Sequence, residues 1–365
     1  MDRIRQLNLK GHLLTAISYL IPVVCGAGFL IAIGMGMGGE TSTDLTQAGY
    51  SIWDALAVMG AVGLGLLPVI ISTGTAFSIA DKPGIAPGVV IGLTANAIGA
   101  GFIGGILGGF LAGYLVKAII KYVKIPNWAK GLMPTLIIPF LTSIIGGLVM
   151  IYIIGAPITV LTSLLTDALN GLGTSSLLVF GIVIGLLSGV DYGGPINKTV
   201  FAFVLTMQAE GLNGPITALQ LVNTATPIGF GLAYFIAKMF RKNIYTSLEV
   251  ETLKSAVPMG FINIVEGVIP IVMNDIVRCI FATAVGGAAG GAVTMVLGAD
   301  ATVPFGGILM LPTMSNPLAG VAALVVNIIV TGLVLALLKK PAKEDEAEEV
   351  ESVEEELNLD DIQIF

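Results

Sequence analysis

Charge is scarce in this chain of 365 residues. Only 11% of the residues are Asp, Glu, Lys or Arg, whereas 55% are hydrophobic and the mean hydropathy is +0.95. A soluble protein of this length has no need of such a composition, so the ordinary soluble class is excluded. The long apolar runs predict membrane-spanning helices instead, because about 20 apolar residues cross the hydrocarbon core of a bilayer.

Histidine and cysteine are nearly missing. His12 is the only histidine, and the two cysteines, Cys25 and Cys279, lie far apart in apolar surroundings. These numbers argue against a metal site, a disulfide framework and a catalytic triad. The chain also has no Walker A motif, no dinucleotide fingerprint and no basic-aromatic surface. We therefore expect no cofactor, no metal, no catalytic residue and no nucleic-acid partner.

Basic residues are missing from the C-terminal tail. Residues 344–365 contain eleven acids and no base, which leaves thirteen acids and seventeen bases in residues 1–343. The low isoelectric point therefore belongs to the tail, and the body carries a net charge of about +4. The composition predicts that residues 339–365 form an acidic, disordered tail.

The positive charges of the body are clustered in a way that predicts membrane topology. Lys and Arg gather at 3–10, 117–130, 238–242 and 339–343, whereas 36–50 contains acids and no base. By the positive-inside rule the four clusters face the cytoplasm, and 36–50 faces outward. The pattern predicts a multi-pass protein of the inner (cytoplasmic) membrane with both termini in the cytoplasm.

The apolar runs set the expected helices. Residues 1–11 predict an amphipathic surface helix, and residues 86–116 fit either a re-entrant segment and a helix or two short helices. Residues 256–316, broken by Pro, Gly and charge, fit one full helix with paired re-entrant hairpins. The Gly-rich stretch GFIGGILGGFLAGY at 101–114 favours close helix packing. The expected spans are 13–35, 52–72, 133–156, 174–190, 215–237 and 317–338.

Four charged residues inside or beside these runs are candidates for function, because a charge in a bilayer is costly: Asp191, Lys198, Glu266 and Asp275. The first two flank a Gly-Gly-Pro break in GVDYGGPINKTVFAF at 189–203. Such a break frees backbone groups, which a polyhydroxylated substrate or water can satisfy. Asn197 adds a donor and an acceptor. The alternative is a cytoplasmic loop whose charges are merely solvated.

The second group lies in GFINIVEGVIPIVMND at 260–275. Glu266 stands in an apolar run with Asn263 one turn before it, and a carboxylate there suits the hydroxyls of a sugar. The alternatives are a structural Glu266–Lys198 ion pair or a loop glutamate. Arg278 is expected to pair with Asp275 or to mark a boundary. The third group, FSIADKPGIAPG at 77–88, predicts a turn, and Asn96 beyond it is expected to face the substrate pathway.

Four segments carry a resemblance to a known family: HLLTAISYLIPVVCGAGFLIAIG at 12–34, FSIADKPGIAPG at 77–88, VDYGGPINK at 190–198 and NIVEGVIP at 263–270. The chain resembles the membrane (IIC) component of the bacterial phosphoenolpyruvate-dependent sugar phosphotransferase system, fructose family. Asn263 and Val265 depart from the family's usual residues at these positions. The resemblance implies an all-α polytopic membrane protein with re-entrant hairpins, similar to the glucose-superfamily IIC proteins.

The resemblance also implies how such a chain is divided and with what it works. A scaffold half, 12–160, forms a homodimer, and a mobile half, 161–338, carries the sugar. Separate IIB and IIA subunits supply phosphate through a phosphorylated cysteine. The carboxylate of Glu266 and the amide of Asn263 are expected to bind sugar hydroxyls. Three further residues are expected to shape the cytoplasmic side of the pocket: Asp191, Asn197 and Lys198.

The function we expect is therefore a sugar permease rather than an enzyme with its own phosphate donor. It binds a hexose outside, carries it inward and presents a hydroxyl for phosphorylation. One alternative is an ion-coupled secondary transporter in which Glu266 or Asp191 carries the proton. Another is a membrane receptor or scaffold that acts through the acidic tail.

Overall fold

The computed structural model describes residues 8–126, 128, 130–171 and 173–342. This part of the chain is helical, with a single isolated β-bridge between Ala301 and Met314. The all-α prediction is confirmed. The elements are α2 (Leu9–Gly36), α3 (Ile52–Gly65), α4 (Leu67–Ala80), α5 (Lys82–Ala97), α6 (Gly101–Tyr122), η2 (Met133–Ile137), α7 (Ile138–Val149), η3 (Met150–Ile154), α8 (Gly155–Asn170), α9 (Thr174–Ser188), α10 (Pro195–Ala209), α11 (Asn213–Met239), α12 (Ser247–Phe261), η4 (Glu266–Val268), α13 (Ile269–Asn274), α14 (Ile276–Leu297), η5 (Gly307–Thr313) and α15 (Pro317–Leu338).

Within the described residues, six helical segments are long and apolar enough to cross a membrane. They are Leu9–Gly36, Gly101–Tyr122, Met133–Val160, Asn213–Met239, Ile276–Leu297 and Pro317–Leu338. Four of them cover spans expected from the sequence. The expected span 52–72 is instead a bent pair, because α3 and α4 meet at 47°. Residues 86–116 fall on two helices, α5 and α6, and α6 is not a short helix, because its 22 residues are enough to cross a membrane.

Other expected segments differ in their limits. The expected span 174–190 is α9, which has 15 residues and is short for a membrane crossing. Of the amphipathic helix expected at residues 1–11, Leu9–Gly11 form the start of α2 and so run directly into the first span, and residues 1–7 lie outside the described part. The expected disorder of the acidic tail falls largely on 343–365, which also lie outside it.

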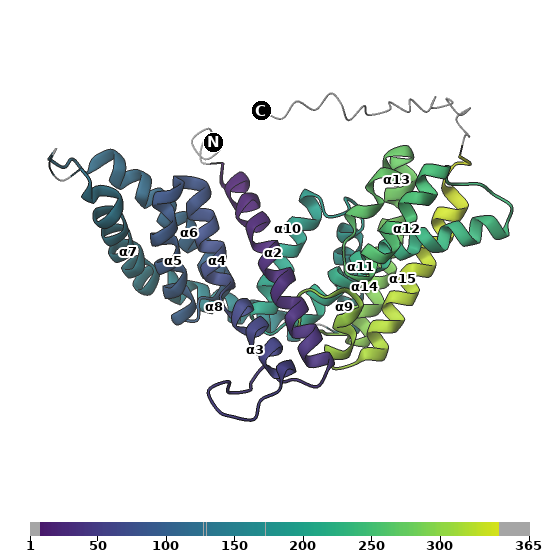
Figure 1. Cartoon of the computed structure of the whole chain (residues 1–365), viewed down its shortest axis with the longest axis horizontal. Coiled ribbons are helices and arrows are strands. Elements are labelled where there is room, and N and C mark those ends of the chain that lie inside the picture. The colour runs from purple at the N-terminus through teal and green to yellow at the C-terminus, as the bar shows by residue number, and fades with distance from the viewer. Residues whose placement is uncertain (1–7, 127, 129, 172, 343–365) are drawn as a thin grey trace, which may run out of the picture.

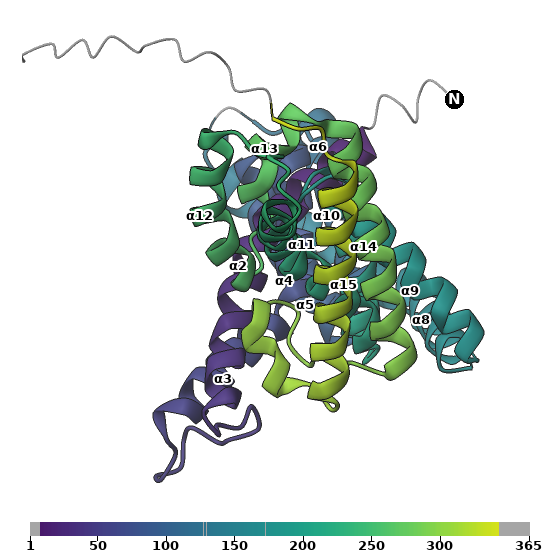
Figure 2. The same cartoon turned by 90° about the vertical axis from the view of Figure 1, so that its right-hand side faces the viewer.

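The helices form two groups around α2 and α10 (Figure 1). Helices α4 to α7 lie on one side and α12 to α15 on the other, while α11 runs among α10, α12, α14 and α15 (Figure 2). A hydrophobic cluster joins the groups, and it includes Leu20, Ile71, Phe102, Leu205 and Leu219. The start of α2 and the end of α15 lie at one edge, opposite the loop 37–51 (Figure 1). This placement fits the alternation expected from the positive-inside rule.

Glycines allow some helices to touch backbone to backbone. Gly181 and Gly185 of α9 face Gly291 and Gly287 of α14, and a side chain at any of these positions would meet the partner's backbone. In α6, Gly105 and Gly109 face the backbone of α4 in the same way. The packing role predicted for the stretch 101–114 is confirmed. Van der Waals contact of this kind holds helices together where lipid removes the hydrophobic driving force.

A hairpin-like connection between α14 and α15 packs against the end of α12. The backbone N–H of Ala301 donates to Thr217 Oγ1 of α11 at 2.8 Å, and the bridge to Met314 closes the connection. Near its tip, Gly307 lies against the backbone of Phe261 and Ile262. These contacts hold the connection beside the segment that carries Asn263 and Glu266.

Candidate functional site

The loop between α9 and α10 is organised by Asp191. Its Oδ2 accepts from the backbone N–H of Ile196 at 2.6 Å, and its Oδ1 accepts from that of Asn197 at 3.0 Å. These N–H groups belong to the first turn of α10 and have no partner within the helix. The Gly-Gly-Pro break ends at Gly194, because Pro195 fits the first helical position and α10 begins there. Asp191 fixes the start of that helix.

Asn197 links this loop to α11. Its buried Nδ2 donates to the Ser188 carbonyl and to Asn223 Oδ1, both at 2.9 Å. The next residue, Lys198, is half-buried, and within the described residues its ammonium group forms no ion pair. The alternative of a structural Glu266–Lys198 ion pair is therefore not what the structure contains.

Glu266 lies in the break between α12 and α13, at the start of η4. Its side chain is exposed, and within the described residues its carboxylate accepts no hydrogen bond. Gly193 lies directly against it: a Cβ atom at that glycine would be 2.5 Å from Glu266 Oε1. The two segments singled out in the sequence are thus brought together, although they are more than 70 residues apart.

Asn263, just before Glu266, is held in place from α11. It is buried and has a left-handed φ of 65°, which Asn tolerates better than most residues. Its Nδ2 donates to Gln220 Oε1, and its Oδ1 accepts from Thr224 Oγ1 at 3.1 Å. The amide predicted to bind sugar is therefore engaged within the protein, where it fixes the break that carries Glu266.

Helix α11 supplies a polar face that sequence reasoning missed. Gln220, Asn223 and Thr224 are buried, and they brace both broken segments through Asn263 and Asn197. The sequence does contain a sign of this polar face, because Asn223 and Thr224 follow Gln220 by three and four positions, and residues with that spacing share one side of a helix. Polar residues with that spacing inside an apolar span indicate an internal network, although hydropathy alone predicts 215–237 as a plain span.

Two further elements border this site. Cys25 of α2 is within electrostatic reach of Glu266. Phe305, in the connection between α14 and α15, packs edge to face on Phe29 of α2, with ring centroids 5.7 Å apart. The site is therefore built from α11, the loop before α10 and the broken segment after α12, while α2 packs against the connection that carries Phe305. Within the described residues, no group of three or more His, Cys, Asp or Glu is placed to hold a metal ion.

Asn96 lies elsewhere. Its Nδ2 donates to the Gly65 carbonyl at 3.3 Å, and it lines a pocket of about 320 Å³ together with Gln208 and Thr302. Gln208 and Asn197 stand at opposite ends of α10, about 16 Å apart along the axis by helix geometry. The structure thus separates Asn96 from the other five candidate residues.

Asp275 belongs to a structural junction at the start of α14. It pairs with Arg278 at 3.1 Å, as the sequence predicted, and accepts from the backbone N–H of Lys340 at 3.2 Å. Burial alone would raise the pKa of Asp275, but the Lys340 hydrogen bond and the Arg278 guanidinium outweigh it and hold the pKa below its usual value. This carboxylate ties the end of α15 to α14 and is separate from the Glu266 site.

No protein-family model matches the chain. Individual proteins do match it, and two of them match over more than 90% of both chains. The "Fructose-like permease IIC component 2" of Escherichia coli is 31% identical over 353 residues, which cover 97% of this chain and 96% of that protein. The chain belongs to the fructose family of phosphotransferase-system IIC membrane components. The "PTS system fructose-specific EIIC component" of Haloferax volcanii is 32% identical, over 91% of this chain and 92% of that one.

Longer relatives match this IIC protein as well. The "PTS system fructose-specific EIIB'BC component" of Xanthomonas campestris is 41% identical over 333 residues, which cover 90% of this chain but 57% of that protein. The chain thus spans little more than half the length of such relatives. Among solved structures, the transporter ChbC, the IIC component of an N,N'-diacetylchitobiose-specific phosphotransferase system, superposes with a TM-score of 0.60 at 14% identity. It covers 92% of this chain and 94% of its own, which supports the polytopic helical fold.

Proposed function

We propose that this IIC protein is a sugar permease of the phosphotransferase system. It binds a hexose, fructose or a related sugar, on the outer side of the membrane and carries it inward. It then presents a hydroxyl group to the phosphocysteine of a IIB unit. Family membership supports this function, and the names of the relatives, which are called fructose-specific or fructose-like, support the sugar class.

The observation that carries the proposal is the carboxylate of Glu266, which has no partner among the described residues and lies beside the backbone of Gly193. A carboxylate with free lone pairs can accept two sugar hydroxyls, and such charge-assisted bonds are strong. The break in the helices around it leaves backbone groups for further hydroxyls. We assign direct sugar contact to Glu266 and a positioning role to Asn263, Asn197 and Asp191, whose polar groups already hold the backbone around it.

Lys198 receives a separate role in this proposal. It stands one residue beyond the braced Asn197, in the first turn of α10, and none of the described carboxylates neutralises it. An ammonium there can attract the phosphoryl group as it approaches the bound sugar. Asn96, at the opposite end of α10, is proposed to meet the sugar only at another stage of the pathway.

The partners and the topology are inferred from the same family. Relatives that carry B or A and B components with C in one chain, such as the EIIABC component of Bacillus subtilis, indicate that IIB and IIA units serve this chain. The buried or half-buried Cys25 and Cys279 lie in apolar helices, unlike a phosphocysteine. We place both termini in the cytoplasm, on the side where IIB donates phosphate.

The two halves are proposed to differ in motion and assembly. The half 12–160 would form a homodimer through α7, whose apolar side chains remain largely uncovered in the monomer: Phe140, Ile144, Ile145 and Leu148. The half 161–338 would carry the sugar, with the broken segments around 189–194 and 262–275 and the connection 298–316 as its re-entrant parts. The cluster of apolar residues between the halves would slide rather than separate.

The deciding experiment is uptake of labelled fructose into vesicles that contain the protein, with the soluble phosphotransferase proteins added. We expect uptake only with phosphoenolpyruvate, and we expect fructose phosphate inside. Accumulation of free sugar that a protonophore abolishes would instead support an ion-coupled transporter with Glu266 or Asp191 as proton carrier. Uptake that survives deletion of 344–365 would exclude a receptor that acts through the tail.

A further inference from the structure

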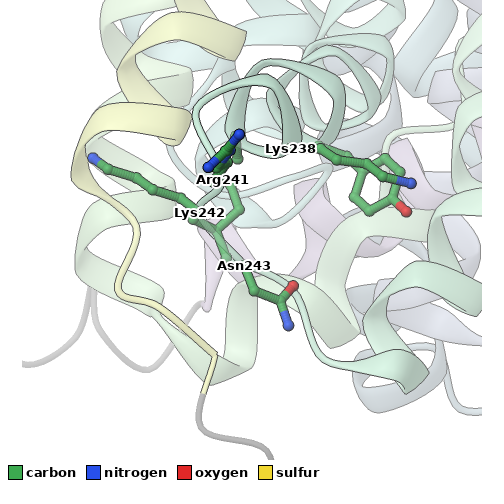
Figure 3. A pocket seen from close by; sticks show the side chains of 7 residues that line it. Lys238, Arg241, Lys242 and Asn243 are labelled. Carbon is green, nitrogen blue, oxygen red and sulfur yellow. The ribbon is translucent and has the colours of Figure 1, made fainter.

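A basic pocket lies at the C-terminal end of α11, away from the Glu266 site. Its volume is about 260 Å³, and Figure 3 shows three cationic side chains that fan out from it. The lining residues are Tyr234, Ala237, Lys238, Arg241, Lys242, Asn243 and Ile244. We call this the basic pocket.

The charges of the basic pocket are not compensated within the described residues. Lys238, Arg241 and Lys242 are exposed, and none of them forms an ion pair there. By contrast, the nearby Lys339 is buried against Glu249, with Nζ and Oε1 3.0 Å apart. Lys238 Nζ lies 5.8 Å from the centre of the Tyr234 ring, a contact that leaves its charge in place. The pocket therefore presents three positive charges that no described carboxylate neutralises.

Arg241 stands at a backbone position that usually belongs to glycine. Its φ is 57°, and the backbone N–H of Lys242 closes the helix end by donating to the Ala237 carbonyl at 2.8 Å. Glycine is favoured after a helix end of this shape because a side chain is strained there. The Arg241 cation lies just beyond the C-terminal end of α11, where the helix dipole favours positive charge. The positive-inside rule accounts for positive charge near the C-terminal end of α11, but it does not specify that Arg241 should carry it.

The described chain ends beside the basic pocket. The backbone N–H of Ala342 donates to the Asn243 carbonyl at 2.8 Å, and Ala342 is the last described residue before the acidic tail. The segment at the end of α15 passes next to Lys242 in Figure 3. In the sequence, Glu344, the first acid of the tail, follows two positions after Ala342. Residues 344–365 carry eleven acids and no base.

We propose that the acidic tail, 344–365, docks in the basic pocket of its own chain. A single exposed ion pair contributes little, so several acids must act together. The tether favours this arrangement, because a short linker raises the effective concentration of the tail to about the millimolar range. A docked tail neutralises the pocket and excludes other anions from it. The proposal does not depend on which sugar the protein carries.

Disulfide trapping tests the docking in the full-length protein. Asn243→Cys and Glu355→Cys are combined, because position 355 is far enough from Ala342 that the tether alone does not impose contact. The protein is placed in nanodiscs with about one-third phosphatidylglycerol, so that anionic headgroups compete for the pocket. The control pair is Lys124→Cys with Glu355→Cys, which reports on the exposed basic cluster that follows α6.

The positive charge of the basic pocket is then removed by combining Lys238→Gln, Arg241→Gly and Lys242→Gln in one triple variant. Glycine suits the backbone at 241, so this variant is expected to keep its thermal unfolding temperature, which is measured alongside. Its matched control removes three cations of the other cluster with Lys117→Gln, Lys121→Gln and Lys124→Gln, with the 243–355 cysteine pair retained. We expect trapping of the 243–355 pair to fall about tenfold in the triple variant of the basic pocket, and also in about 0.5 M salt. We expect no such fall in the control triple variant.

Three results would overturn the proposal. Equal trapping of the 243 and 124 pairs would show that the tail has no preferred place. Trapping that is unchanged by both the cation substitutions and salt would show that electrostatic attraction does not hold the tail near the basic pocket. Trapping that occurs in phosphatidylcholine discs but disappears with phosphatidylglycerol would assign the basic pocket to lipid headgroups instead of the tail.

Discussion

Gly193 and Glu266 lie in direct contact, the glycine backbone against the carboxylate. A Cβ atom at residue 193 would be 2.5 Å from Oε1 and 3.0 Å from Cδ of Glu266, and Gly193 has a φ of 84°. Glycine is thus favoured by the backbone conformation, and a side chain at residue 193 would displace the carboxylate of Glu266. This contact joins the Gly-Gly-Pro loop to the broken segment after α12, and it places the free carboxylate beside exposed backbone.

Gly193→Ala is expected to weaken sugar binding by displacing the Glu266 side chain. The substitution also adds backbone strain of about 1–2 kcal/mol, as for any residue in the left-handed region. Gly211→Ala is the matched control, because Gly211 has the same φ of 84° but no atom near its would-be Cβ. Calorimetric titration with sugar should show a loss of affinity for Gly193→Ala only. Equal affinities in the two variants would contradict the contact's role.

Glu266→Gln is expected to lower sugar affinity roughly ten- to a hundredfold while the protein stays folded. An exchange of a carboxylate for an amide removes charge-assisted hydrogen bonds worth about 1.5–3 kcal/mol. Glu251→Gln serves as the control, since Glu251 is an exposed glutamate on α12 whose described ion pair is a surface contact with Lys254. Unchanged binding by Glu266→Gln in calorimetry would remove Glu266 from the site.

The sequence was sufficient to identify the broken segments but not the contacts that hold them. Charge within apolar runs singled out Glu266, and helix-breaking residues singled out the loop at 191–195. The bracing bonds to α11 join residues 26 to 43 positions apart, such as Asn197 with Asn223 and Asn263 with Gln220. Composition and spacing within one segment carry no information on such pairs, because the register between helices is set by packing.

The roles of individual polar groups were also beyond the sequence. Asp191 was expected at the substrate pocket, yet both of its oxygens accept from the first turn of α10. Whether an acid caps a helix or meets a ligand depends on where the helix starts, and a boundary shift of about four residues decides it. The last span, by contrast, was predicted at 317–338, because Pro317 and the lysines after Leu338 mark its ends.

Asn197 and Asn223 are expected to show coupled effects on stability. Replacing either by Ala removes one partner of a buried 2.9 Å hydrogen bond and leaves the other unsatisfied, at a cost of about 1–3 kcal/mol. The double variant should therefore lose less than the sum of the single losses. Thermal unfolding in detergent, with and without sugar, measures the cycle. Strict additivity would show that the two amides do not act as a unit.

The buried pair of Lys339 and Glu249 is expected to be essential for the C-terminal end of α15. Both side chains are 4% exposed, so Lys339→Met leaves a buried carboxylate unpaired and should cost about 3–5 kcal/mol. Adding Glu249→Gln should restore part of this loss. Lys254→Met breaks an exposed pair instead and should cost at most about 1 kcal/mol. The order of the unfolding temperatures checks the prediction, and equal losses for the two lysines would contradict it.

Lys198→Ala is expected to slow phosphorylation of bound sugar more than it weakens sugar binding. The ammonium stands in the first turn of α10 without an ion-pair partner among the described residues, where it can stabilise the charge of an incoming phosphoryl group. Calorimetry gives the affinity, and single-turnover transfer from phosphorylated IIB gives the rate. Lys198→Arg keeps the charge and should retain more of the rate than Lys198→Ala.

Double variants separate this role from simple charge balance around the site. If Lys198 only compensates a carboxylate, then adding Asp191→Asn or Glu266→Gln to Lys198→Ala should restore transfer. Because no described carboxylate pairs with Lys198, we expect the other outcome, in which Lys198→Ala with Asp191→Asn stays slow in transfer although its sugar affinity remains near that of Asp191→Asn alone. Recovery of the rate in either double variant would assign Lys198 a purely structural role.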